Sequence, residues 1–231
     1  MSPRVLAVVL IVLLALGPLV LPEFHVTLLN YIGLYSLVAL GLVLLTGVGG
    51  LTSFGQAAFV GLGAYTTGYL TTAQELPAVL SWFAVSPWLT LVAGLLVTLA
   101  VAGILGLLTL RLSGHYLPLG TLAWGMSLYF LFGNVSFLGG HTGMTGIPPL
   151  SLFGHDLRDG RHLYYVIWLI LLAAIWMTQN LLDSREGRAI RALKGGGIMA
   201  EAMGVDTARS KMIIFLIAAA FAAISGWLYA H

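Results

Sequence analysis

One stretch of the chain, residues 183–211, is strongly charged, and apolar runs flank it on both sides. It reads DSREGRAIRALKGGGIMAEAMGVDTARSK and holds ten of the eighteen Asp, Glu, Lys and Arg residues, six of them Lys or Arg. The neighbouring runs, His162–Leu182 and Met212–His231, are long enough to cross a bilayer as helices. The positive-inside rule places a basic segment between two such spans in the cytoplasm. This assignment orients every other predicted span.

Apolar residues make up 59% of the chain and charged residues 8%, so lipid must solvate most of its surface. The sequence therefore predicts an all-α, polytopic integral membrane bundle of about seven transmembrane helices. We expect residues 1–182 to hold helices one to six with an outer loop at 134–161, and residues 212–231 to form the last helix. The five earlier spans are expected at Val5–Leu21, Leu28–Leu45, Leu51–Leu70, Trp88–Leu110 and Tyr116–Phe132.

The distribution of basic residues supports a cytoplasmic N-terminus. With residues 183–211 inside, eight of the ten Lys and Arg residues, including Arg4 and Arg111, fall on the cytoplasmic side. The first apolar run has the alternative of being a signal peptide. We favour a retained span, because Ala15-Leu16-Gly17 followed by Pro18 is a poor cleavage site.

Several classes of chemistry find no support in the sequence. The chain has no cysteine, and its predicted spans carry no Asp, Glu, Lys or Arg at mid-membrane depth. The histidines lack the spacing of a metal site, and there is no phosphate-binding Gly-rich loop. No basic tract with interleaved aromatics suggests nucleic acid. We therefore expect no catalytic residue, metal or cofactor, and a transport subunit in contact with membrane lipid.

The run TGVGG at Thr46–Gly50 interrupts the apolar pattern, and three uncharged polar residues follow it: Thr52, Ser53 and Gln56. Interrupted helices are tolerated in membranes where they line a cavity or are buried in protein, so these residues are candidates for a transport pathway. The alternative is a plain cytoplasmic turn, with Thr52 or Ser53 as the cap of the next helix.

The charged stretch predicts two short helices. Ser184 precedes a basic amphipathic segment, Gly195-Gly196-Gly197 interrupts it, and Ile198–Met203 forms a second segment that stops at Gly204. Exposed apolar residues on such a pair suit a docking element for a partner. A helix lying on lipid headgroups explains the pattern equally well.

Two motifs carry a resemblance to a known family. Residues 30–70 closely resemble the M-type permease subunit of branched-chain amino acid ABC importers, most specifically at GGLTSFGQAAFVGLGAY. Residues 187–231 are similar to the family's cytoplasmic coupling segment and following span, and TGMTGIPP in the outer loop is similar too.

The resemblance implies an ABC importer permease in the inner or plasma membrane that works by alternating access. It also implies a second permease subunit, two cytoplasmic ATP-binding subunits and an extracytoplasmic substrate-binding protein. Residues 183–211 would then be a coupling segment that contacts the ATPases. The residues that match its motif, or lie beside it, are Arg191, Ala200, Glu201, Ala202, Met203 and Gly204.

The chain departs from the family pattern at two places. Gly195–Gly197 stands where acidic or amide residues are usual, and the family continues with further spans beyond the position of His231. We therefore expect a C-terminally truncated form. The alternatives to an amino acid importer are a stand-alone facilitator or channel, a truncated non-transporting fragment, and a urea or amide importer subunit.

Overall fold

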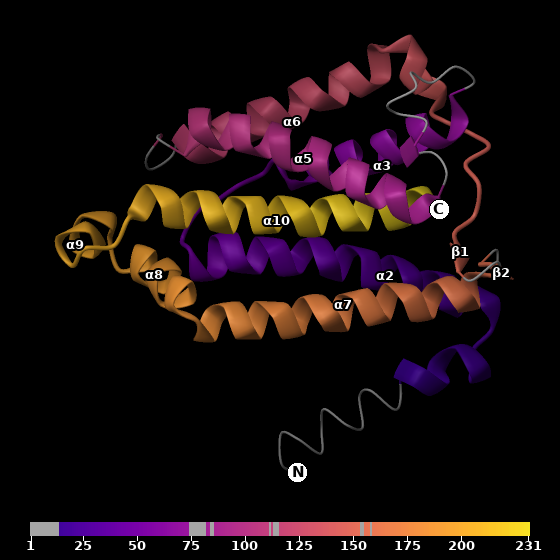
Figure 1. Ribbon diagram of the computed structural model, residues 1–231, viewed down its shortest axis with the longest axis horizontal. Helices are drawn as coiled ribbons and strands as arrows, with labels where there is room; N and C mark the ends of the chain where they lie inside the picture. Colours follow the sequence, from indigo (N-terminus) through magenta and orange to yellow (C-terminus); the bar gives the residue numbers. More distant parts are fainter. Residues whose placement is uncertain are drawn as a thin grey trace.

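The computed structural model describes residues 14–73, 82–83, 86–110, 112, 116–152, 155–157 and 159–231. Its long helices run side by side, and α8 and α9 project from one end (Figure 1). The α-helices are α2 (Glu23–Leu42), α3 (Gln56–Thr72), α5 (Pro87–Thr109), α6 (Tyr116–Asn134), α7 (Gly160–Asp183), α8 (Arg185–Lys194), α9 (Gly197–Ala202) and α10 (Thr207–Ala230).

The remaining elements are short. A π-helical turn, η1 (Val43–Val48), continues α2, and two 3-10 turns, η2 (Ser136–Leu138) and η3 (Gly140–Thr142), follow α6. The strands β1 (Ser151–Leu152) and β2 (His155–Asp156) pair antiparallel, with Ser151 opposite Asp156. These elements give the predicted outer loop a folded structure at the end of the bundle opposite α8 and α9 (Figure 1).

Four helical segments within the described residues are long and apolar enough to cross a membrane, and they coincide with four of the predicted spans: Glu23–Val48, Pro87–Thr109, Gly160–Asp183 and Thr207–Ala230. The segment Tyr116–Asn134 qualifies only together with Ser136–Thr142, to which it is bent by 85°. α3, with 17 residues, rises about 25 Å and is shorter than a full span. The first predicted run lies mostly outside the described residues. The chain is thus a multi-pass helical membrane protein, and its described residues hold four spans, or five if the bent pair is counted as one.

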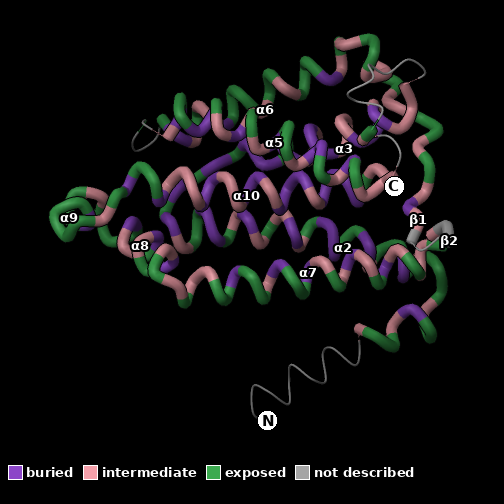
Figure 2. Tube along the Cα trace, viewed as in Figure 1, coloured by how far each residue is buried: buried purple, intermediate pink, exposed green. Residues whose placement is uncertain are grey.

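α10 forms the centre of the bundle. It packs against α2, α3 and α5, and its buried surface faces all three (Figure 2). The small residues that recur every four positions along it include Ala218 and Ala222, both 0% exposed. Small residues let helix backbones approach closely, which drives helix association in lipid. This stripe of small residues therefore lies at the most crowded position in the bundle.

Two glycines make the contact between α3 and α10 possible. A methyl group built on Gly63 would overlap backbone atoms of Ala223, and one built on Gly226 would overlap the carbonyl group of Val60. α2 approaches α10 almost as closely, since a Cβ on Gly41 would lie 3.1 Å from the Cα of Ala218. No side chain larger than hydrogen fits at these crossings without moving a backbone.

Hydrogen bonds fix the C-terminal half of α10. The Ser225 hydroxyl donates to the carbonyl oxygen of Leu34 on α2 at 2.9 Å. The indole N–H of Trp227 donates to the carbonyl oxygen of Pro87 at 2.9 Å and to the Thr90 hydroxyl at 3.2 Å. Both side chains are buried, so each bond satisfies a polar group that lipid could not. α10 is thereby held to both α2 and α5.

Helix starts follow local capping chemistry. Asp159, Ser184 and Asp206 each accept a backbone N–H at the start of α7, α8 and α10, respectively. Because Asp206 caps α10, this helix begins at Thr207 and not at Met212, so its first turn extends into the charged stretch. Pro118 lies in the first turn of α6, where its missing N–H removes no helix hydrogen bond.

The glycine contact predicts a sharp difference between two otherwise equivalent substitutions. Gly226→Ala should destabilise the bundle by about 1–3 kcal/mol, because its methyl group overlaps the Val60 backbone. Gly103→Ala on α5 is the matched control, since nothing lies within 4 Å of that position and alanine favours the helix. The midpoint of thermal unfolding in detergent should fall only for Gly226→Ala. Equal midpoints for the two variants would show that the crossing is not tight.

Candidate functional site

The first candidate site is the end of the bundle where α8 lies across the ends of the long helices, the end predicted to face the cytoplasm. Its N-cap Ser184 accepts a hydrogen bond from the backbone N–H of Gly187. Ile190 and Leu193 are buried, so α8 turns an apolar face to the bundle and a basic face outward. At its other end, the Lys194 ammonium donates to the carbonyl oxygen of Gly47 at 2.9 Å. α8 is therefore attached to the bundle along its whole length.

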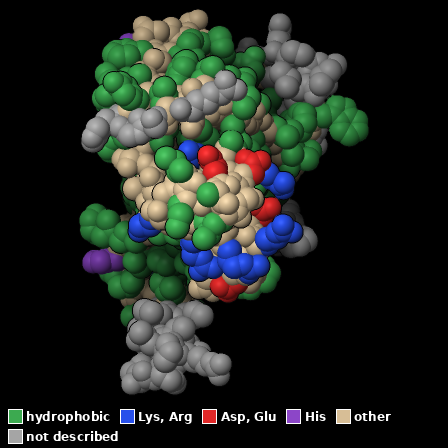
Figure 3. Space-filling model, turned by 90° about the vertical axis from the view of Figure 1, so that its left-hand side faces the viewer, with side chains coloured by type: hydrophobic (Ala, Val, Ile, Leu, Met, Phe, Trp, Pro, Cys, Tyr) green, Lys and Arg blue, Asp and Glu red, His purple; other side chains and the backbone are tan. Residues whose placement is uncertain are grey.

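α9 projects beyond α8 because glycines bound it on both sides. Gly196 has a φ of 120° and Gly204 a φ of 80°, conformations that favour glycine, and the predicted helix breaks lie at these positions. Between them Ile198 is 88% exposed and Met203 76%, and Met199 is also exposed. Viewed from this end, hydrophobic side chains lie among Lys and Arg side chains (Figure 3). An apolar cluster with a charged rim is typical of a protein-docking surface.

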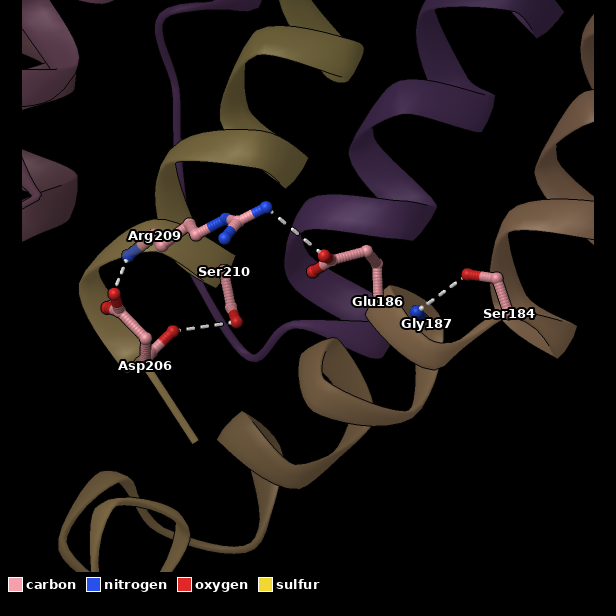
Figure 4. A network of polar contacts seen from close by, with 6 residues as sticks. All are labelled: Ser184, Glu186, Gly187, Asp206, Arg209 and Ser210. Atoms are coloured by element: carbon pink, nitrogen blue, oxygen red, sulfur yellow. Dashed lines mark hydrogen bonds and ion pairs between the residues drawn. The ribbon is translucent and has the colours of Figure 1, made fainter. Parts of the chain in front are cut away.

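A polar network ties α9 and α8 to the start of α10. The Thr207 hydroxyl donates to a carboxylate oxygen of Glu201 at 2.5 Å, and Thr207 is buried. Arg209 on α10 pairs with Glu186 on α8 at 3.4 Å (Figure 4). In the same network Asp206 accepts from the Arg209 backbone N–H, and Ser210 donates to the Asp206 carbonyl oxygen (Figure 4). Displacement of α9 would therefore be passed directly to α10.

The predicted coupling residues have different environments. Ala202, Met203 and Gly204 are exposed on the surface of the α9 turn. Ala200 is buried and packs α9 onto the rest of the segment. The Arg191 guanidinium donates to the Leu182 carbonyl oxygen at the end of α7, and Glu201 holds Thr207. Five of the six residues are thus exposed, and two of these five, Arg191 and Glu201, also form hydrogen bonds within the segment.

The second candidate site is the helix break after η1. Residues 50–55 have no regular secondary structure, and α3 begins at Gln56 with Gly55 as its N-cap. The expectation that Thr52 or Ser53 caps this helix is therefore wrong, because the helix starts later and neither side chain accepts a hydrogen bond from its first turn. Ser53 and Gln56 are buried and lie together in the bundle, whereas Thr52 is exposed.

A residue from a distant helix completes the break. Thr121 on α6 accepts a hydrogen bond from the Phe54 backbone N–H at 3.1 Å, which satisfies a donor freed by the loss of helix. Sequence reasoning missed Thr121. The sequence holds one signal for this residue, its position three residues after Pro118. In the structure the Thr121 hydroxyl donates to the Pro118 carbonyl oxygen at 3.0 Å.

A groove of about 420 Å³ lies beside the break, between α2 and α3. Ser53 and Gln56 line it from the break, and Ser225 lines it from α10. Its other walls are apolar side chains, among them Leu34, Val38, Leu42 and Val60. The groove therefore combines a few polar groups with an apolar lining, as small-molecule sites do. Over the described ranges, no cluster of His, Asp or Glu could hold a metal ion.

Comparison with known proteins identifies the family of the chain. A family model described as "Branched-chain amino acid transport system / permease component" matches residues 24–231. The "High-affinity branched-chain amino acid transport system permease protein LivM" of Salmonella typhimurium is 29% identical over 96% of this chain and 56% of its own length. LivH of Escherichia coli is 26% identical over 84% of this chain and 65% of its own length. No solved structure gives a significant match.

The relatives named LivM support the M-type resemblance. LivM of Escherichia coli is 28% identical over 98% of this chain and 57% of its own length, a larger share of the chain than LivH matches. The chain spans a little over half the length of these LivM relatives. The family match covers all the described helices from α2 to α10. The chain therefore belongs to the family of branched-chain amino acid transport system permease components.

Proposed function

We propose that the chain is a permease subunit of an ATP-driven ABC importer that takes up branched-chain amino acids by alternating access. It would lie in the inner or plasma membrane with its N-terminus in the cytoplasm. Its partners would be a second permease subunit, two cytoplasmic ATP-binding subunits and an extracytoplasmic substrate-binding protein. The observation that carries the proposal is the exposed α9 turn, which is attached to the central helix of the bundle.

The α9 turn has the features needed to receive force from an ATPase. Ile198, Met199 and Met203 are large apolar side chains exposed in a charged, water-facing part of the chain. Such residues are costly to leave in water and contribute most when a partner buries them. A groove of about 720 Å³ adjoins the turn, lined by Arg185, Arg188, Arg209 and Met203 among others. Glu186 and Asp206 line it too, so the three arginines leave the groove with a small net positive charge, which would favour an acidic rim on the ATPase.

The link from α9 to the membrane runs through α10. Glu201 holds Thr207 in the first turn of α10, and Gly226 in the outer half of the same helix lies against the α3 backbone. A contact this close cannot slip by small side-chain rearrangements, so α3 would move with α10. Binding of ATP to the partner subunits would then bias the break at residues 50–55 between two states.

Replacing an exposed anchor of the α9 turn should separate the ATPase from the permease. Met203→Asp should weaken ATPase binding by at least about tenfold, because burial of a Met side chain contributes about 1.5–3 kcal/mol. Affinity purification of the tagged chain from its native membranes, followed by quantification of co-purifying ATPase, measures this. Ala208→Asp is the control, since it adds the same charge at another exposed position of the segment. Full retention of the ATPase by Met203→Asp would contradict the docking assignment.

A second variant separates docking from coupling. Thr207→Val removes the hydroxyl that Glu201 accepts from, so the ATPases should stay bound while leucine uptake falls by roughly two- to tenfold, given about 0.5–1.5 kcal/mol for the bond. Thr27→Val is the matched control, because its hydroxyl donates to a carbonyl oxygen at the outer end of α2. ATP-dependent uptake in proteoliposomes is the measurement. Unchanged uptake by Thr207→Val would show that this link transmits nothing.

A further inference from the structure

The N-terminus of α3 lies inside the membrane span and not at its edge. The groove beside it is lined by Ser225 and Tyr229 of α10, and Phe59 in the first turn of α3 packs edge-on against Phe215. Phe215 lies about 12 Å into Thr207–Ala230 at about 1.5 Å per residue, so α3 begins away from the N-terminal end of that span, and the groove extends from there toward its C-terminal end. Figure 1 shows α3 beginning near the middle of the bundle. A helix N-terminus at this depth carries a partial positive charge in surroundings that screen it poorly.

This N-terminus has no side-chain cap. Gly55 occupies the N-cap position, and Ser53 accepts a backbone N–H from Gly55 and none from the first turn of α3. In the first turn of α3, the Ala58 N–H donates to the Gly55 carbonyl oxygen at 3.1 Å. Exposed N–H groups at a helix start favour an anion.

Gln56 provides an independent indication of a missing ligand. It is 4% exposed and lines the groove, yet neither Oε1 nor Nε2 of its amide has a hydrogen-bond partner among the described residues. A buried amide without partners destabilises the fold, so its presence needs an explanation. The amide has both a donor and an acceptor to offer, which matches a group that carries both charges.

The rest of the groove matches an aliphatic side chain. Leu34, Val38, Leu42 and Val60 form apolar walls, and Tyr35 and Tyr229 also line the groove. Among the described residues, no Asp, Glu, Lys, Arg or His lines it. A net charge on the ligand would therefore lack a counter-charge, whereas a zwitterion is neutral overall. The volume of about 420 Å³ lies in the ~300–1,000 Å³ range of small-molecule sites.

We propose that this groove holds the amino acid during its passage, with the α-carboxylate at the N-terminus of α3. Gln56 Nε2 donates to the carboxylate, Gln56 Oε1 accepts from the α-ammonium group, and the aliphatic side chain lies on the α2 wall. This assignment rests on the proposed function. It adds a binding site within the permease that recognises the backbone of the amino acid and excludes charged side chains.

The cysteine-free chain allows a direct test in the assembled complex, reconstituted in lipid nanodiscs. Val38→Cys places a thiol in the groove, and Ser127→Cys places one on an exposed part of α6 outside it. The labelling rate of this chain with a water-soluble maleimide is measured with and without leucine. At leucine tenfold above its dissociation constant, labelling of Val38→Cys should slow by about tenfold, and that of Ser127→Cys should not change. Leucinamide, which lacks the carboxylate, should not protect.

Adding Gln56→Leu tests the role of the amide. This substitution removes the unpartnered polar atoms, so the unfolding midpoint should not fall, while leucine protection of Val38→Cys should be lost. A groove covered by lipid or by the second permease subunit would leave Val38→Cys unlabelled, and this result would overturn the proposal. So would labelling that leucine does not slow, or protection that survives Gln56→Leu.

A parallel uptake assay separates this proposal from the proposed function. If the complex imports leucine in an ATP-dependent manner but leucine protects nothing in the groove, the binding site is wrong and the importer assignment stands. If the complex imports no leucine at all, the importer assignment itself fails.

Discussion

The close contact between the backbones of α3 and α10 is the constraint on which the rest of the structure depends. In lipid there is little hydrophobic gain from pressing helices together, so association relies on van der Waals contact and on small residues that permit it. Gly63 and Gly226 allow two backbones to touch, and the alanines of α10 extend the contact along the helix. α2 and α5 then pack around this pair. α3 can therefore be short and begin in mid-span, because α10 supports it on one side.

The break before α3 is tolerated because its polar groups are mostly satisfied within the protein. Thr121 accepts from Phe54, and Ser53 accepts from Gly55. Gln56 is the exception, with an amide that is buried and unpartnered in the described part of the chain. Natural proteins keep unsatisfied polar groups where function needs them. Elsewhere in the bundle Thr67, Thr90 and Thr109 bond to carbonyl oxygens of their own helices, whereas the hydroxyls of Thr98 and Thr178 are buried without a partner among the described residues.

Much of the fold could be predicted from the sequence, because membrane length and small-residue spacing are strong signals. The spans around Leu37, Ala102, Ile167 and Ala218 lie where apolar runs placed them, and the glycines at 195–197 and 204 bound α9 as expected. The partners of each polar residue could not be predicted. Thr121 and Phe54 are 67 positions apart in sequence and meet only through tertiary packing, and no sequence pattern pairs Glu201 with Thr207. Hydrogen bonds between such residues leave no local pattern in the sequence.

We expect movement of the α9 turn to reach the helix break at residues 50–55 through α10. A single cysteine at Thr52, exposed beside the break, reports on that segment in the assembled complex. The maleimide labelling rate should change on addition of ATP with the Thr207 hydroxyl present, and the change should vanish in a Thr207→Val background that still binds the ATPases. An ATP-dependent change that persists without the Thr207 hydroxyl would contradict the claim, since the signal would then reach the break by another route.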